Sequence, residues 1–393
     1  MTEERVRPRT TLGDLARLFL KLGTIGFGGP AAHIALMEDE VVRRRGWLTR
    51  EAFLDYLGAT NLIPGPNSTE LAIEIGRDRA GWPGLVVAGV AFIVPAALIV
   101  CVTAWAYVRF GSLPAALSLF AGVKPVIIAI VVQALWRLAR TAVKTRWLGA
   151  LTAAAIVAVA AGVHELVVLV AAAFLSVAAA AARSHDVDQR VSMAVPIGAS
   201  VIGSTPRLAG ALGAAVGMRA AMSLWSLFAI FLKIGSVLFG SGYVLLAFLR
   251  ADFVERLGWL TERQLLDAVA VGQVTPGPVL TTATFIGYVL AGVPGAVLAT
   301  AGIFLPAFVF VAVSGPLIPR LRRSRLAGAA LDGVNAASLG LMAVVTWQLG
   351  RASIVSVSSG IVAVSAGALL ATRRVNAAWL VLGGAIAGIA LGM

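Results

Sequence analysis

Two Pro-Gly-Pro triplets, at 64–66 and 276–278, stand among polar side chains inside otherwise apolar stretches. Unpaired backbone groups are costly in hydrocarbon, so such breaks are tolerated only where they are buried in protein or line a watery cavity. The residues after the second proline should begin a half-helix, whose start carries unpaired N–H groups and about half a positive charge and therefore suits an anion. The candidate ligands at the two breaks are Asn61, Pro64, Gly65, Pro66, Asn67, Ser68 and Glu70, and Gln273, Thr275, Pro276, Gly277, Pro278, Thr281 and Thr282.

A second pair of motifs, FGGP at 27–30 and FGSG at 239–242, follows a lysine by one or two helical turns. Lys21 and Lys233 lie in apolar spans, where we expect a charge to pair with a carboxylate such as Glu70 or Asp55, or to meet a negative substrate. Two other interpretations stay open: the lysines snorkel to the membrane interface, or the glycines serve close helix packing. Because glycine lets a backbone approach a ligand closely, the motifs add five candidates, Gly28, Gly29, Pro30, Gly240 and Ser241.

Glu70 and Glu74 lie four residues apart, on one face of the expected half-helix, and the second break has no acidic equivalents. These glutamates therefore distinguish the first half from the second, and they serve either as proton carriers or as partners for Arg77 and Arg79. The GWLT motifs at 46–49 and 258–261 end in threonines that we interpret as helix N-caps rather than ligands.

Composition places these motifs in a membrane. Of the side chains, 59% are apolar and only 13% charged, the mean hydropathy is +0.91, and residues 85–108, 268–319, 352–372 and 375–393 hold no charged side chain. Stretches of about 20 such residues match the thickness of a bilayer core. The chain is predicted to be an all-α polytopic membrane protein of about 10–13 membrane segments, some broken or re-entrant. A disulfide scaffold, a disordered tail and a nucleic-acid-binding domain are excluded.

The charge excess of +13 has a topological interpretation, because arginines cluster between apolar spans as they do in cytoplasmic loops. Attraction of anions to the membrane is a further role that the excess allows. Cys101 is the single cysteine and the three histidines share no ligand spacing, so neither a metal site nor a cofactor is expected. No removable signal peptide is visible.

The chain repeats itself. Residues 19–66 align on 231–278 at an offset of 212 with 18 identities in 48 positions, and the match continues at an offset of 211 from AGWPG at 80–84 on AGVPG at 291–295. We therefore expect an N-terminal repeat at 1–182, a linker at 183–222 and a C-terminal repeat at 223–393.

Arginine positions favour an inverted relation between the repeats. Inverting the second half brings six arginines to the cytoplasmic side and exports only three, Arg250, Arg256 and Arg263. Inverted repeats are a common plan of transporters. The six that move inside are Arg320, Arg322, Arg323, Arg325, Arg373 and Arg374.

With FGGP, GWLT, PGPNSTE and AGWPG in one half, and FGSGY, GWLT, QVTPGP and AGVPG in the other, the chain resembles the chromate ion transporter family in its long, two-domain form. The resemblance implies a multi-pass protein of the bacterial inner membrane that exports chromate and confers resistance, with sulfate as competitor. Sulfate or other oxyanion uptake or exchange remains an alternative, and a membrane-embedded enzyme is a remote one that no known motif supports. The expected partners are the oxyanion and lipid, with a homodimer left open and no nucleic acid.

Overall fold

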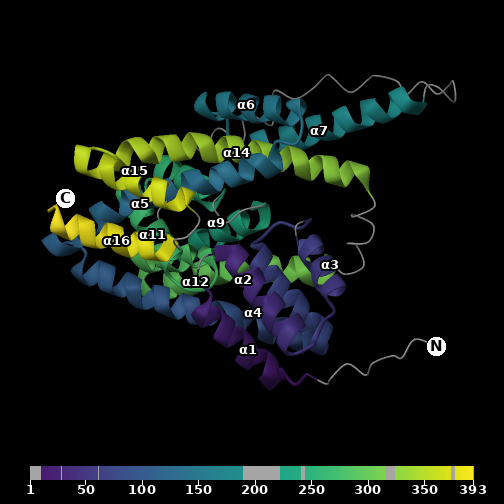
Figure 1. Cartoon of the computed structure of the whole chain (residues 1–393), viewed down its shortest axis with the longest axis horizontal. Helices are drawn as coiled ribbons and strands as arrows, with labels where there is room; N and C mark the ends of the chain where they lie inside the picture. Colours follow the sequence, from purple (N-terminus) through teal and green to yellow (C-terminus); the bar gives the residue numbers. More distant parts are fainter. Residues whose placement is uncertain are drawn as a thin grey trace.

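The computed structural model describes residues 10–27, 29–60, 62–188, 222–239, 244–314, 324–372 and 377–392, and these form helices joined by short turns (Figure 1). The elements of the first half are α1 Leu12–Ile25, α2 Gly29–Glu38, the π-helical η1 Asp39–Arg44, α3 Arg50–Thr60, α4 Asn67–Phe110, α5 Pro114–Ala142, α6 Arg146–Ala160 and α7 Glu165–Asp188. Those of the second half are α9 Leu224–Val237, α10 Leu245–Leu249, the π-helical η3 Arg250–Arg256, α11 Glu262–Val274, the 3-10 turn η4 Val279–Thr281, α12 Thr282–Ser314, α14 Arg325–Ser353, α15 Val357–Ala371 and α16 Ala377–Ala390.

The prediction of a helical membrane protein is confirmed. Within the described residues, five helices are long and apolar enough to cross a bilayer, and four shorter apolar helices accompany them. The number of crossings stays a prediction, as do the domain boundaries, because residues 189–221 of the expected linker lie outside the described residues.

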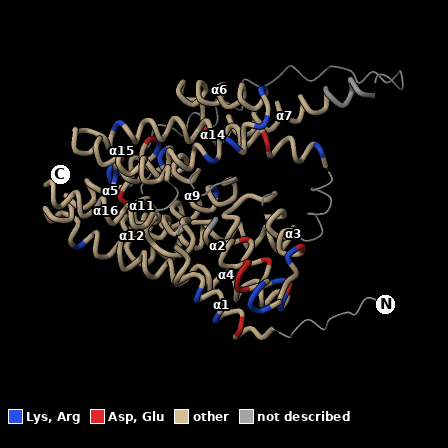
Figure 2. The backbone as a smooth tube through the Cα atoms, viewed as in Figure 1, with Lys and Arg blue, Asp and Glu red and all other residues tan. Residues whose placement is uncertain are grey.

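Helix α4 carries an exposed apolar stripe between two tryptophans. Trp82 and Trp105 are 66% and 52% exposed and, at 1.5 Å per residue, lie about 35 Å apart along the helix. That distance suits side chains at the two interfaces of a bilayer whose core is about 30 Å thick. Figure 2 shows charged residues gathered around α1 and α3 rather than along this part of α4. Between the tryptophans, every fourth side chain is exposed and apolar: Val86, Val90, Val94, Leu98 and Val102.

Helices α4 and α12 each reverse direction at a glycine. The backbone leaves helical geometry at Ala80 and Gly81, where Gly81 has φ +60°, and it does so at the same place in α12. Gly76 and Gly84 then contact each other, although residues eight apart in a straight helix lie about 12 Å apart along its axis. The AGWPG and AGVPG motifs therefore encode tight turns between two packed helices.

Each Pro-Gly-Pro triplet lies at the tip of a second hairpin. Helix α3 runs into the first tip and the opening segment of α4 returns beside it, since the Tyr56 hydroxyl donates to Asp78 Oδ1 at 2.7 Å. In the second half, Gly272 of α11 contacts Thr282 of α12 across the other tip. The breaks predicted from the sequence are thus turns that connect two antiparallel helices.

The equivalent helices α4 and α12 pack against each other and run in opposite directions. In the segments that follow the two turns, Gly89 of α4 lies against the ring of Phe308. Tyr107, further along α4, meets Phe285 with ring centroids 5.1 Å apart. Phe285 lies before the turn of α12, and the contact of Gly287 with Gly295 brings it level with the early part of the later segment, well before Phe308. Residue numbers therefore rise along one helix as they fall along its neighbour.

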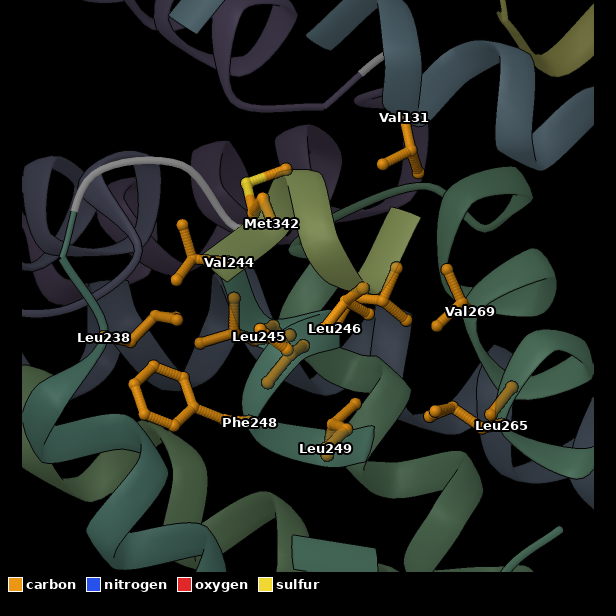
Figure 3. Packing of buried hydrophobic residues seen from close by; sticks show 14 of the residues in the cluster. Val131, Leu238, Val244, Leu245, Leu246, Phe248, Leu249, Leu265, Val269 and Met342 are labelled. Carbon is orange, nitrogen blue, oxygen red and sulfur yellow. The ribbon is translucent and has the colours of Figure 1, made fainter. Parts of the chain in front are cut away.

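The short helix α10 lies at the centre of the largest hydrophobic cluster, and all five of its residues are buried. Figure 3 shows its leucines between Val131 of α5, Leu265 of α11 and Met342 of α14. Because Val131 belongs to the first half, the core joins the two repeats.

We predict that Gly76→Leu destabilises the protein by about 1–3 kcal/mol, because the new side chain meets the Gly84 backbone and overpacks the hairpin. Gly367→Leu is the matched control, since its Cβ meets no atom within 4 Å. Thermal unfolding of the purified protein in detergent measures the difference. Equal melting temperatures for the two variants would contradict the packed hairpin.

Candidate functional site

Each Pro-Gly-Pro tip meets the residue that stands just before the glycine motif of the opposite half. The Gly65 N–H donates to the Leu238 carbonyl at 2.7 Å, and the Gly277 N–H donates to the Gly26 carbonyl at 2.9 Å. The offset of 212 relates Gly65 to Gly277 and also Gly26 to Leu238, so these two bonds are equivalent and reciprocal. Gly65 and Gly277 have φ of +141° and +86°, which favour glycine at both tips.

His33 adds a polar bridge that only the first half has. Its ring is buried, Nε2 lies 2.9 Å from the Gly26 carbonyl and Nδ1 lies 3.3 Å from Ser68 Oγ. Since a carbonyl only accepts, Nε2 carries a hydrogen, and in the neutral ring Nδ1 accepts from the serine. The equivalent residue of the second half is Leu245, which cannot make either bond. The first break is therefore the polar one.

Glu70 is fully buried beside the first tip, where a Cβ on Gly65 would collide with its carboxylate. Neither carboxylate oxygen has a hydrogen-bond partner among the residues that the structure describes. The neighbouring Thr69 hydroxyl is also buried and unpartnered within the same part of the chain. An unpaired ionised carboxylate is costly in such a place, so this group requires a proton or a ligand of opposite charge. Glu74, one turn on, lies 3.8 Å from Arg77 instead.

The second tip is less polar. The hydroxyls of Thr275, Thr281 and Thr282 donate to backbone carbonyls of their own helical turns, at 2.7, 2.8 and 2.9 Å. The hydroxyl hydrogens of these threonines are therefore not available to a ligand, and only the lone pairs of their oxygens remain free to accept a hydrogen bond. Gln273 and Thr282 line a small cavity beside Val131 and Leu245.

The remaining candidates fall into two groups. Gly29, at φ +76°, begins α2 with Pro30, while Pro64, Pro66, Asn67 and Ser68 form the first tip and the start of α4. Pro276 and Pro278 flank Gly277 at the second tip. The other four candidates, Gly28, Asn61, Gly240 and Ser241, lie outside the described residues.

The two lysines have partners other than those expected. Lys21 Nζ lies 2.6 Å from Glu40, and Lys233 Nζ lies 2.5 Å from Asp252. Each lysine therefore pairs with a carboxylate, as expected, but Glu70 and Asp55, the two acids named as examples, are the wrong ones. The offset of 212 relates both members of these pairs. The reason is the π-helical turn in each half, which carries the acid to the lysine, and no spacing rule anticipates such a turn.

Thr49 and Thr261 act as the predicted N-caps. Thr49 Oγ1 accepts from the Ala52 N–H, and Thr261 forms a capping box with Gln264.

A buried ion pair joins the halves and was not predicted. Lys124 Nζ of α5 lies 3.1 Å from Asp267 of α11, whose other oxygen accepts from the Tyr107 hydroxyl of α4 at 2.9 Å. Lys124 stands in an apolar span just as Lys21 does, so the same signal could have found it.

A multi-pass helical membrane protein, built from two repeats that join at their broken helices, is the class that this fold and site define. The chain matches the chromate transporter family model twice, over residues 13–177 and 225–389. It therefore belongs to the chromate transporter family, in its long form, and this is a family of transporters rather than enzymes. The resemblance drawn from the motifs is confirmed.

Three relatives cover most of the chain. The chromate transport protein of Cupriavidus metallidurans is 34% identical over 390 residues, which span 97% of this chain and 94% of that protein. The chromate transport protein of Pseudomonas aeruginosa is 32% identical over 351 residues, 89% of this chain and 84% of its own. The probable chromate transport protein of Synechococcus elongatus is 31% identical over 357 residues, which span 89% of this chain and 87% of that protein. No solved structure matches the chain.

We predict that the pair Lys233–Asp252 is coupled by about 1–3 kcal/mol in a double-mutant cycle of Lys233→Met and Asp252→Asn, because the acid is only 5% exposed. The exposed pair Lys144–Asp332 is the control and should give about 0–1 kcal/mol. Chemical or thermal unfolding in detergent measures both cycles. Equal coupling in the two pairs would refute a structural role for the buried one.

Proposed function

We propose that this protein exports a tetrahedral dianion, with chromate as the favoured substrate, through a site where the two Pro-Gly-Pro tips cross. The reciprocal bonds of Gly65 and Gly277 carry the proposal, because they bring two helix starts to one place between the halves. The names of the three relatives supply the substrate. Their bacterial origin supports a place in the bacterial inner membrane.

The orientation of the halves is part of the proposal. Antiparallel packing of α4 against α12 supports inverted repeats, since both helices are long and apolar enough to cross a bilayer. The axis between them then lies in the membrane plane, as in many transporters. On this account the α3–α4 and α11–α12 hairpins are re-entrant, with their tips near the midplane.

Membrane potential suffices as a driving force. A dianion that leaves a cell negative inside gains about 4.6 kcal/mol per 100 mV, twice the single-charge value. If one proton leaves with it, the gain falls to about 2.3 kcal/mol per 100 mV, less about 1.4 kcal/mol for each pH unit by which the inside is more alkaline. At equal chromate concentrations and 100 mV, export with one accompanying proton therefore stays downhill while the inside is less than about 1.6 pH units more alkaline.

Glu70 is the proposed proton carrier. An ionised Glu70 would repel a dianion bound at the first tip and would compete with it for the positive end of α4. Binding of the anion therefore favours a protonated Glu70, and the two leave together. Two charged side chains near it have ion-pair partners: Lys21 of α1 pairs with Glu40, and Glu74 of α4 pairs with Arg77. Helix α2 also carries His33 and Glu38, and α3 carries Arg50, Glu51, Asp55 and Tyr56, whereas α12 has no charged residue.

Uptake or exchange of sulfate, or of another oxyanion, is the second candidate function. Backbone N–H groups at the start of a helix recognise an anion by its charge and its tetrahedral shape, and chromate and sulfate share both. Sulfate is accordingly expected to compete with chromate.

We predict that inverted vesicles that contain the protein accumulate labelled chromate when a lumen-positive potential is imposed, because their lumen corresponds to the cell exterior. Vesicles without the protein are the control, and excess sulfate should slow the accumulation. Cells that express the protein should tolerate more chromate and contain less of it. Equal accumulation in both vesicle preparations would rule out chromate export.

We predict that Glu70→Gln lowers net chromate uptake by inverted vesicles at least about tenfold while exchange of chromate for chromate continues, because a permanently neutral side chain cannot release its proton. In the wild type, an alkaline lumen should quicken uptake, and the variant should not respond. Glu74→Gln, one turn along the same helix, is the control that keeps the response. An unchanged response to lumenal pH in Glu70→Gln would disprove the role of Glu70.

A further inference from the structure

A cavity of about 700 Å³ opens at the far end of α11 from the second tip. It lies where α5, α11, α15 and α16 gather beside the C-terminus (Figure 1). At 1.5 Å per residue, the 13 residues of α11 place it about 20 Å from the Pro-Gly-Pro tip at 276–278. Its polar lining comes from Lys124, Glu262, Arg263, Ser353, Ser356, Ser358 and Ser359.

The charged side chains of this wall differ in their ion pairs. Lys124 is paired with Asp267, and Glu262, which also lines the cavity, shares Arg250 with Glu255. Arg263 forms no ion pair with any residue that the structure describes. It also lines a second cavity of about 390 Å³, together with Tyr107 and Asp267. The guanidinium therefore stands between two open spaces, with the buried ion pair behind it.

Hydroxyl groups face the same cavity. Ser353 is only 6% exposed, and its Oγ has no hydrogen-bond partner in the described chain, although a buried hydroxyl normally has one. Ser356 caps the 15-residue helix α15, whose first turn holds Ser358 and Ser359. A helix start, a guanidinium, a lysine and an unpartnered hydroxyl together form a donor set for an oxyanion.

We propose that this cavity is a second, peripheral binding site for a tetrahedral oxyanion. Arg263 holds the anion, and the unpartnered Ser353 hydroxyl donates to it. Asp267 is the ion-pair partner of Lys124 when the site is empty, and the anion takes its place beside Lys124. Occupation then places the substrate at the outer end of α11, on the approach to the second tip. The binding itself is independent of the proposed export, whereas its role as the capture site rests on that function.

The first half lacks this site. Arg263 corresponds at the offset of 212 to Glu51, an acid that repels a dianion. With the halves inverted, the equivalent end of the pathway opens on the other side of the membrane. The oxyanion is therefore captured on one face of the protein only.

Protection of a cysteine tests the site directly. Ser358→Cys in a Cys101→Ser background is treated with a negatively charged methanethiosulfonate, and sulfate should slow modification at least about threefold in a saturable way, beyond chloride of equal ionic strength. Arg263→Gln should abolish the protection, and Glu51→Gln should keep it. Protection by sulfate no greater than by chloride, or protection that survives Arg263→Gln, overturns the proposal. Modification rates without sulfate, and size-exclusion profiles, confirm that each variant is folded.

A second measurement separates this site from transport. Sulfate should still protect Ser358→Cys when Glu70→Gln is added, since the peripheral site does not need net transport. Arg263→Gln should raise the KM for chromate about fivefold with kcat unchanged. Loss of protection in the Glu70→Gln background would show that the signal reports the central site and would overturn the peripheral one. Failure of chromate transport with protection intact would refute the export function alone.

Discussion

The structure depends on the need to pair every backbone N–H and carbonyl group in an apolar interior. Each Pro-Gly-Pro tip interrupts its own helix, and its glycine N–H donates to the carbonyl that stands just before the glycine motif of the other half. The two halves therefore satisfy each other's backbone groups at the tips. The tight turns at Gly81 and Gly292 follow from this, because they bring the long segments of α4 and α12 back against the joined tips.

On this symmetric frame the two halves carry different chemistry. The ion pairs Lys21–Glu40 and Lys233–Asp252 occupy equivalent positions and preserve the shape of both halves. His33 and Glu70, by contrast, correspond to Leu245 and Thr282 in the second half, so these titratable side chains of the first tip have no titratable equivalents at the second. The two halves therefore share one architecture and differ at a few buried positions.

The sequence predicted most of the architecture because its signals are local. The proline and glycine breaks, the N-cap threonines and the repeat offset are all read from short motifs, and the structure places them at tips, turns and helix starts. Partners between distant segments could not be predicted in this way. Lys21 pairs with Glu40 through a π-helical turn, and Lys124 meets Asp267 only because α5 crosses to the other half. His33 was visible only as a histidine without metal-ligand spacing, since its role depends on the position of the Gly26 carbonyl.

One labelling experiment tests whether the two halves run in opposite directions across the membrane. Arg43 and Glu255 are exposed and equivalent at the offset of 212. In a Cys101→Ser background, a single cysteine is placed at one position or the other, and intact cells are treated with a membrane-impermeant thiol reagent. The account predicts that only one of the two positions is labelled from outside and that both are labelled once the cells are permeabilised. Labelling of both positions, or of neither, in intact cells would contradict it.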